Sequence, residues 1–248
     1  MCGRYAASRN PDDLVEEFEV DRVEVSERLQ PDYNVAPTKD VYAVLTRRAK
    51  DLPDDAPPPR QLRVLRWGLV PSWAKDPSVG NRLINARVET VDVKPSFRRA
   101  FAARRCLLPA DGYYEWYVRE SGPKQPFYLH PRDGGSLAMA GLYEFWRDPT
   151  KDADDPDAWL TTCVIITAEA ADELGHIHDR MPMVVAPADW AAWLDPARTD
   201  PADVKALLVP AATALLEAYP VATLVNSPRN NGPELIEPVA LEGDDAPF

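Results

Sequence analysis

Residues 106–118, CLLPADGYYEWYV, decide the fold of this chain. They contain two strand-like runs, Cys106–Pro109 and Gly112–Val118, in which aromatic and β-branched residues are frequent. Runs of the same kind surround them on both sides, at 41–46, 62–69, 126–129, 137–145 and 160–167. The sequence therefore predicts a protein built mainly from β-strands.

Helices are expected to be few and short. Asn10-Pro11-Asp12-Asp13 is typical of a helix start, with Leu14, Val15 and Phe18 forming the buried stripe of that helix. Further helices are predicted at 97–104, 187–194 and 201–208, and the last two begin with proline. Short strands are predicted at 183–186 and 235–239, while 33–38 and 71–85 indicate turns and irregular structure.

The order of these elements predicts the fold class. Strands do not alternate regularly with helices, which argues against a doubly wound α/β fold. We expect an α+β fold, one domain over residues 1–248, with a curved, largely antiparallel, barrel-like sheet and short flanking helices. The aspartate-rich stretches Asp51–Arg60 and Arg147–Asp157 are interpreted as surface loops of that domain.

Composition indicates an intracellular globular protein. The chain has 248 residues, 45% of them hydrophobic, which is ample for a packed core. Its three cysteines lack CxxC spacing, so neither a disulfide framework nor structural zinc is indicated. No apolar run approaches the ~20 residues of a membrane span, and no leader peptide opens the chain. We expect a cytoplasmic location, in which thiols stay reduced.

The net charge of −12 argues, at first sight, against a nucleic-acid partner. The charge is unevenly distributed, however. Residues 81–119 carry eight basic and four acidic side chains, which gives +4 there and −16 for the remainder. A positive groove on an acidic body fits this pattern, and so do arginines in ordinary surface ion pairs.

Cys2 is the first candidate for chemistry. Removal of Met1 would leave its thiol beside a free α-amine, a 1,2-aminothiol. The pKa of an α-amine is about 7.7–8.0, against about 10.4 for lysine, so a useful fraction is neutral at pH 7. A neutral amine attacks aldehydes to give an imine, and the thiol can then close a five-membered thiazolidine. The alternative is a retained Met1 and a small buried Cys2.

Two polar residues in apolar or aromatic surroundings are candidate partners. Asn85, in LINAR, could orient the Cys2 amine or simply satisfy loop backbone. Glu115, wedged in GYYEWY, has a setting that raises a carboxyl pKa and suits general acid–base catalysis, although strand alternation could instead point it at solvent. Glu144, in LYEF, shares that setting and competes with Glu115.

His178 and several basic or aromatic residues complete the candidates. His178 is one of two alternating histidines, and Asp179 next to it could poise the imidazole near neutrality. Stacking on bases and contact with phosphates are chemistries open to Arg4, Trp73, Arg87, Phe97 and Arg98. Core packing of the aromatics and solvation of the arginines are the ordinary alternatives.

Taken together, these segments resemble the SRAP (SOS response-associated peptidase) family, whose members capture abasic sites in single-stranded DNA. The matching pieces occur in order along most of the chain: MCGRY at 1–5, YNVAPT at 33–38, WGLVPSW at 67–73, INARVETV at 84–91, PSFRRAF at 95–101, RRCLLPADGYYEW at 104–116, AGLYEFW at 140–146, CVIITAEA at 163–170 and IHDRMP at 177–182.

The resemblance implies a role for each catalytic candidate. Cys2, freed by self-removal of Met1, would form an imine and then a thiazolidine with C1′ of the ring-opened sugar. Asn85 would hold the amine, Glu115 would shuttle protons, and His178 would protonate the ring oxygen. A lyase side reaction, β-elimination from the imine, is also implied, and ring closure would suppress it.

The resemblance also implies the partner. We expect a monomer, without cofactor or metal, that binds single-stranded DNA containing abasic sites and associates with the nucleoid when it acts. The expected DNA contacts are Arg4, Arg87, Asn34, Pro37, Trp73, Phe97 and Arg98. The acidic loops predict weak, salt-sensitive binding of intact DNA.

Three alternatives stay open. An N-terminal-nucleophile amidohydrolase of the glutaminase type also begins Met-Cys-Gly, but it usually continues with an apolar residue and lacks IHDRMP. A non-enzymatic nucleic-acid- or protein-binding module would need no free Cys2. A zinc protein is disfavoured because the cysteines and histidines lack ligand spacing.

Overall fold

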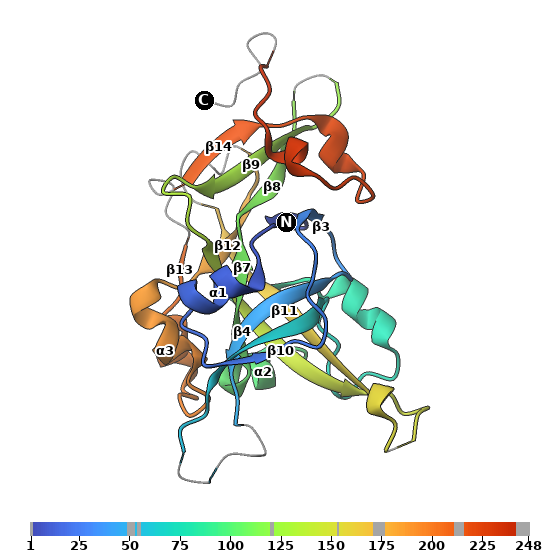
Figure 1. Cartoon of the computed structure of the whole chain (residues 1–248), viewed down its shortest axis with the longest axis vertical. Coiled ribbons are helices and arrows are strands. Elements are labelled where there is room, and N and C mark those ends of the chain that lie inside the picture. The colour runs from blue at the N-terminus through green and yellow to red at the C-terminus, as the bar shows by residue number, and fades with distance from the viewer. Residues whose placement is uncertain are drawn as a thin grey trace.

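The computed structural model describes residues 2–48, 53, 56–119, 122–152, 154–170, 177–210 and 216–241. Part of the predicted loop 51–60 and residue 153 of the loop 147–157 lie outside the described residues. Two sheets dominate the fold, one above the other in Figure 1, and the N-terminus lies between them. No helix within the described ranges combines the length and apolar character that a membrane span requires.

The smaller sheet has five strands in the order β14-β9-β8-β1-β3. Its strands are β14 (Leu216–Pro220), β9 (Gln125–Pro131), β8 (Gly112–Tyr117), β1 (Tyr5–Ala7) and β3 (Asp32–Val35). The pairing of Tyr5 with Tyr113 joins the N-terminal strand to β8. This register brings the N-terminal residues close to the aromatic strand that carries Glu115.

The larger sheet curls until it meets itself. Its long strands are β4 (Asp40–Thr46), β5 (Arg60–Trp67), β7 (Arg105–Ala110), β10 (Leu137–Arg147) and β11 (Trp159–Glu169). Each pairs with the next in the order β10-β7-β4-β5-β11, and β11 pairs again with β10, so the five strands form a closed ring. The shorter strands at its margins are β2 (Arg22–Glu24), β6 (Asn85–Arg87), β12 (Arg180–Val184) and β13 (Val209–Pro210).

Helices occupy the outside of this ring. They are α1 (Pro11–Glu17), α2 (Arg98–Ala103), α3 (Trp190–Leu194) and α4 (Pro201–Lys205), with 3₁₀ turns η1 (Pro77–Arg82), η2 (Pro156–Ala158), η4 (Pro187–Asp189), η6 (Thr223–Asn226) and η7 (Pro233–Ile236). Asn10 caps α1 by accepting hydrogen bonds from the backbone N–H groups of Asp12 and Asp13, as predicted. The fold is α+β with short helices and a curled, mostly antiparallel sheet, and the predicted class is confirmed.

Strand alternation divides the apolar side chains into two packed layers. On β4, Tyr42 and Val44 face the layer that includes the helices, where Phe18 stacks on Trp190 with 4.7 Å between the ring centroids. Val41, Ala43 and Leu45 face the layer that includes Cys2 and the smaller sheet. Cys2 is therefore buried where the two sheets pack together.

A close approach of two glycines positions β6. Gly68 has a φ of 124°, and a Cβ built there would lie 2.6 Å from the Gly80 carbonyl oxygen. Only glycine fits such an approach without displacing backbone. This approach brings the end of the irregular stretch 71–85 back beside residue 68. β6 then lies next to β11, and Asn85 pairs with Ile165.

Three sequence predictions differ from the structure. The segment predicted as the strand 235–239 contains the 3₁₀ turn η7, because Pro233 begins the turn and prolines donate no ladder hydrogen bond. The turn-rich stretch 33–38 overlaps strand β3. The strand predicted at 183–186 begins earlier, at Arg180, so the IHDRMP motif runs directly into β12.

Candidate functional site

Four predicted residues come together where the two sheets meet. Cys2 lies three residues before β1, Glu115 lies on β8, Asn85 begins β6, and His178 lies two residues before β12. They are far apart in the sequence, and the pairings of β1 with β8 and of β11 with both β6 and β12 bring them together. Met1 lies outside the described residues.

The Asn85 side chain contacts Cys2 directly. Its Nδ2 donates a hydrogen bond of 2.8 Å to the Cys2 carbonyl oxygen. Its Oδ1 is buried and has no hydrogen-bond partner among the described residues. Buried acceptors usually have donors. This oxygen is therefore available to an amino group beside it.

Glu115 is a buried carboxyl group with a perturbed pKa. Its side chain is 3% exposed. Burial raises the pKa of Glu115 to about 7, and the positive charge of the chain's N-terminus opposes the shift. A carboxyl group that titrates near neutrality can both give and take a proton at physiological pH.

His178 faces the same carboxyl group. Its Nε2 lies 3.8 Å from Glu115 Oε2, too far for a direct hydrogen bond but close enough for both to reach one substrate atom. Burial lowers the pKa of His178, which favours a neutral imidazole at pH 7. Its Nδ1 accepts a 3.0 Å hydrogen bond from the backbone N–H of Arg180, so the proton of the neutral ring is assigned to Nε2.

The Cys2 thiol is held in its protonated form. Burial, and after it the charge of Glu115, raises the pKa of the Cys2 thiol well above its usual range. The thiolate is the nucleophilic form of cysteine. A thiol in this setting is a poor first nucleophile.

Glu144, the competitor for the acid–base role, has a different environment. Its Oε2 accepts a 2.6 Å hydrogen bond from Arg104, and its Oε1 accepts one from the backbone N–H of Phe145. Both oxygens are therefore engaged away from Cys2. The geometry favours Glu115.

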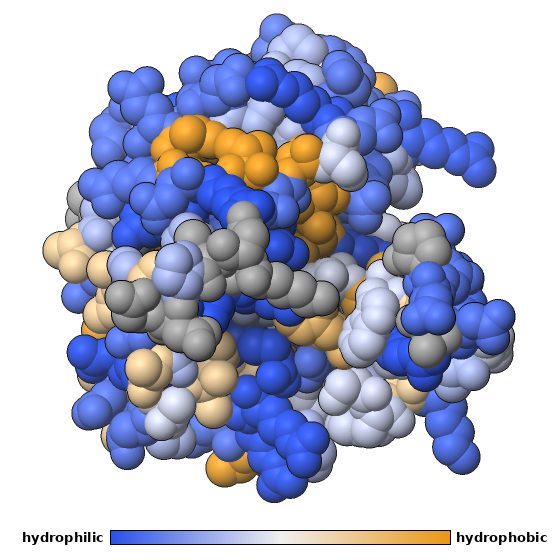
Figure 2. Space-filling model, turned by 60° about the horizontal axis from the view of Figure 1, so that its bottom comes forward, coloured by the Kyte–Doolittle hydropathy of each residue, from blue (hydrophilic) through white to orange (hydrophobic). Residues whose placement is uncertain are grey.

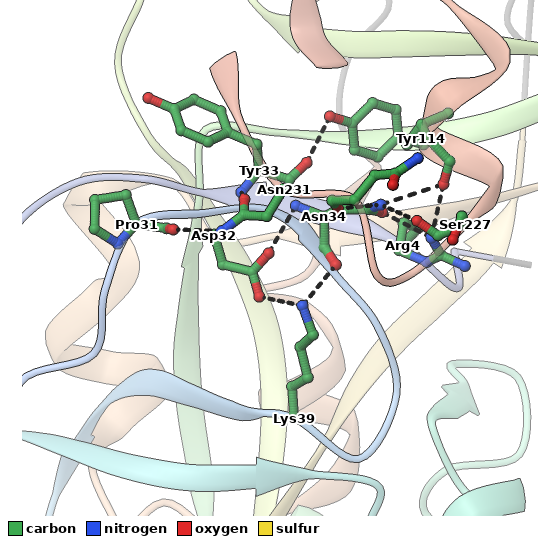
Figure 3. A network of polar contacts seen from close by, with 11 residues as sticks. Arg4, Pro31, Asp32, Tyr33, Asn34, Lys39, Tyr114, Ser227 and Asn231 are labelled. Atoms are coloured by element: carbon green, nitrogen blue, oxygen red, sulfur yellow. Dashed lines mark hydrogen bonds and ion pairs between the residues drawn. The ribbon is translucent and has the colours of Figure 1, made fainter. Parts of the chain in front are cut away.

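Arg4 and Asn34 belong to one polar network (Figure 3). Arg4 Nη1 donates to Asn34 Oδ1 at 2.7 Å and to the Val225 carbonyl at 2.9 Å. Asn34 is fully buried, and its Nδ2 donates to the carbonyls of Val225, Ser227 and Asn230. Asn34 thus fastens the segment 225–230 beneath the site, and its side chain is not exposed to a ligand.

The remaining predicted DNA contacts differ in exposure. Trp73 is 61% exposed, Arg87 and Arg98 are exposed, and Pro37 is partly exposed. Phe97 is only 3% exposed and packs with the layer that includes the helices. In this conformation the Phe97 ring is not available for stacking on a base.

Two residues near the site were not singled out from the sequence. Glu89 and Arg180 form a two-point ion pair, with distances of 2.8 and 3.2 Å. Both lie inside the motifs INARVETV and IHDRMP, so the motifs contained a signal for them. Burial of the arginine, at 8% exposed, could not be read from the sequence.

A small pocket lies at this site and is lined by Glu115, His178 and Arg180, among other residues. Figure 2 shows a face on which hydrophilic residues predominate, with a group of hydrophobic residues above its centre. A mostly apolar cavity of about 740 Å³ lies beside α1, β10 and α3. None of its lining residues belongs to the group around Cys2. This cavity therefore lies apart from the group around Cys2.

Known proteins resemble this chain over nearly its whole length. A family model described as SOS response associated peptidase (SRAP) matches residues 1–228. The chain is 39% identical to the abasic site processing protein YoqW of Bacillus subtilis (strain 168), covering 96% of this chain and 99% of that protein. Identity to the abasic site processing protein YedK of Escherichia coli (strain K12) is 33%, covering 96% and 100%.

A third relative and a crystal structure extend the comparison. The abasic site processing protein HMCES of Gallus gallus is 34% identical, covering 86% of this chain and 68% of that protein. The X-ray structure of a protein from Bacteroides thetaiotaomicron superposes with a TM-score of 0.80 at 25% identity, covering 96% of this chain and all of the other.

Proposed function

The chain belongs to the SOS response associated peptidase family, and from that premise we propose that it captures abasic sites in single-stranded DNA as a covalent adduct of Cys2. The observation that carries the proposal is the group of side chains around Cys2. The Asn85 amide donates a hydrogen bond to the Cys2 carbonyl, Glu115 is a buried carboxyl group with a pKa of about 7, and the His178 imidazole faces Glu115. The names of its relatives, abasic site processing proteins, support the same substrate.

The first step is removal of Met1, by the protein itself, to expose the Cys2 α-amine. Hydrolysis of the Met1–Cys2 peptide bond consumes one water and releases methionine. The amine then takes the place beside Asn85, whose buried Oδ1 can accept a hydrogen bond from it. The positive charge of the N-terminus lowers the pKa of Glu115 and so acts on this carboxyl group. Glu115 is therefore our candidate for the group that moves protons in this step.

Capture then proceeds by amine first and thiol second. The neutral amine attacks the C1′ aldehyde of the ring-opened sugar to give a carbinolamine, which loses water to form an imine. The thiol adds to the imine carbon and its proton passes to the nitrogen, which closes the thiazolidine. This order fits a thiol whose pKa is raised by burial, because an amine does not require prior formation of a thiolate.

Glu115 and His178 act at different steps of this reaction. His178, carrying its proton on Nε2, donates toward the ring oxygen of the closed sugar and assists ring opening. Glu115 protonates the carbinolamine oxygen as it leaves as water and takes a proton when the adduct reverses. β-Elimination from the imine gives a lyase side reaction, and thiazolidine formation removes the imine on which it depends.

DNA contacts follow from exposure. Trp73, Arg87, Arg98 and Pro37 have the accessible surface that stacking or phosphate contact requires. Arg4 lies two residues after Cys2, and we propose that its Nη2 contacts the strand, since Nη1 is engaged and Nε is buried. Asn34 serves indirectly, by holding Arg4.

The test is incubation of the purified protein with an abasic single-stranded oligonucleotide, followed by a denaturing gel. The expected result is a slow-migrating adduct with the wild type and none with Cys2→Ala. Once Met1 is removed, both variants keep the α-amine and lack the thiol, so each should give an imine that borohydride traps but no durable adduct. A durable adduct with either variant would contradict the assignment.

Intact-mass analysis tests the first step separately. The expected mass lacks methionine. A retained Met1 would favour a non-enzymatic binding role. Glutaminase activity on free glutamine would favour the amidohydrolase alternative, in which a thiolate would have to attack first.

A further inference from the structure

The segments that carry Asn85 and His178 lie on the two sides of one strand, β11. β6 and β12 both pair with β11, where Arg87 lies opposite Thr167 and Arg180 lies opposite Glu169. Asn85 begins the short strand β6, and His178 lies just before β12. Backbone pairing with β11 positions each segment, and side-chain contacts across β11 can join the two.

One side-chain bridge crosses β11 at this point. Arg180, 8% exposed, binds Glu89 through both terminal nitrogens, and its Nη2 also donates to the Thr167 carbonyl at 2.7 Å. The same carbonyl accepts the backbone N–H of Val88. The bridge thus joins the segment that follows Asn85, strand β11 at Thr167, and the segment that follows His178.

The arginine of this bridge also contacts the imidazole through its backbone. The Arg180 N–H donates to His178 Nδ1 at 3.0 Å, while Asp179 Oδ1 lies 2.9 Å from the same nitrogen. The two partners make opposite demands. Accepting from Arg180 requires an unprotonated Nδ1, whereas pairing with Asp179 requires a protonated one. The placement of Arg180 therefore decides between two states of the ring.

We propose that Glu89 is a positioning residue that, through its two-point pair with Arg180, holds His178 in the tautomer with the proton on Nε2, facing Glu115. The catalytic consequence rests on the proposed function, since only the Nε2–H tautomer presents a donor to the sugar oxygen. Other charges also face the ring, from the N-terminus, Lys124 and Asp179, and Glu115 lies 3.8 Å from Nε2. All of these stay in place when Glu89 is changed.

Loss of the Glu89 carboxylate removes the two-point ion pair that holds the Arg180 guanidinium. Arg180 is then held by Thr167 and by its backbone pairing with Glu169 alone. We expect its N–H to be held less firmly against Nδ1, so that the competing pair with Asp179 gains population. Lysine cannot reproduce a two-point contact. Arg180→Lys should therefore behave like Glu89→Gln although it keeps the charge.

The chain offers a matched control three residues further on. Asp92 pairs with Lys205 of α4 at 2.7 Å, so Asp92→Asn also removes an ion pair from this segment. That pair contacts neither Arg180 nor His178. A general loosening of the segment would affect both variants, whereas loss of the bridge affects only Glu89→Gln.

The primary readout is the tautomer of His178 in the free protein, from ¹⁵N histidine resonances, with His178→Gln used for assignment. We expect an unprotonated Nδ1 at neutral pH in the wild type and in Asp92→Asn. In Glu89→Gln and Arg180→Lys we expect a shift toward protonated Nδ1. The double variant should shift no further than either single variant, because both remove one bridge.

The second readout is the rate of adduct formation against pH. Glu89→Gln should slow capture by about three- to tenfold, less than loss of the acid–base group itself, and should displace the histidine limb of the profile to higher pH. A wild-type tautomer in Glu89→Gln, or an equal effect of Asp92→Asn, would overturn the proposal. If the wild type captures no abasic strand, the proposed function fails, while the tautomer measurement still decides the bridge.

Discussion

Glu115 and Glu144 have similar neighbours in the sequence, but their partners in the fold differ. Each lies among aromatic residues on a strand, so local sequence left the acid–base role open between them. In the structure Glu144 binds Arg104, and Glu115 faces His178. The partners come from strand pairings over long sequence distances, which no local pattern contains.

Replacing each carboxyl group by its amide separates their roles. Glu115→Gln should slow adduct formation by about 10²-fold or more, the range typical of general acid–base groups. Glu144→Gln should change it by less than about threefold. Single-turnover adduct formation on denaturing gels measures both. Equal loss in the two variants would mean that the acid has been misassigned.

The pKa of Glu115 also predicts how stability depends on pH. The folded-state pKa of about 7 is raised from 4.5, so the folded protein binds this proton more tightly than the unfolded chain does. The stabilisation is complete below about pH 4.5 and is lost as pH rises toward 7. Glutamine cannot ionise. Relative to the wild type, Glu115→Gln should therefore gain stability over this window, on the order of 3 kcal/mol, and stay level above it.

Urea unfolding at pH 4.5, 6 and 8 measures this gap. Glu144→Gln serves as the control, and its difference from wild type should not follow the same rise. A gap for Glu115→Gln that stays constant with pH would show that Glu115 titrates normally.

At the scale of elements, the C-terminal segment completes the smaller sheet. η6 lies against the face of β8 opposite Glu115, where Trp116 donates to Asn226 at 2.7 Å and Asn34 binds three backbone carbonyls. Asn34→Ala takes the Asn34 donor from the carbonyls of Ser227 and Asn230 and leaves Arg4 Nη1 with the Val225 carbonyl as its remaining acceptor, so we expect a loss of about 2–4 kcal/mol. Asn226→Ala breaks one partly exposed bond and should cost about 1 kcal/mol.

Urea unfolding of the two variants, with capture rate measured in parallel, checks this prediction. Asn34→Ala should also slow capture, because it removes one of the two acceptors that hold Arg4 near Cys2. If both variants lost the same small amount of stability, the segment would not be fastened by Asn34.

Elements differed in how well the sequence predicted them. The long strands and α1 were predictable because they have alternating or capped patterns of their own. The three-residue strands β1, β2 and β6 have no room for a pattern, and they exist only because a neighbouring strand pairs with them. Two of them carry or adjoin site residues, which is why the motifs, more than periodicity, indicated the site.

At the scale of the molecule, a charge of −12 must coexist with a DNA partner. Binding of intact single strands should be weak and should fall steeply with salt, because few phosphate contacts act against a negative body. Arg87→Ala and Arg98→Ala should each reduce the slope of log affinity against log salt by about 0.7, the value for one single-strand phosphate contact.

Fluorescence anisotropy with a labelled oligonucleotide, over a range of salt concentrations, measures the slope. Arg28→Ala is the control, since Arg28 is exposed but paired with Asp12 on α1. An unchanged slope in Arg87→Ala, or an equal change in Arg28→Ala, would mean that the strand follows another path.

The proposed capture requires the N-terminal aminothiol, and peptide mapping of the adduct tests this requirement most directly. The wild-type protein is incubated with abasic single-stranded DNA, both are digested, and the linked peptide is sequenced by mass spectrometry. We predict that the sugar remnant is attached to a peptide that begins at Cys2, with the mass of amine plus aldehyde minus one water and with no free thiol at Cys2. Attachment at a lysine, or an adduct on a chain that still begins with Met1, would contradict the account.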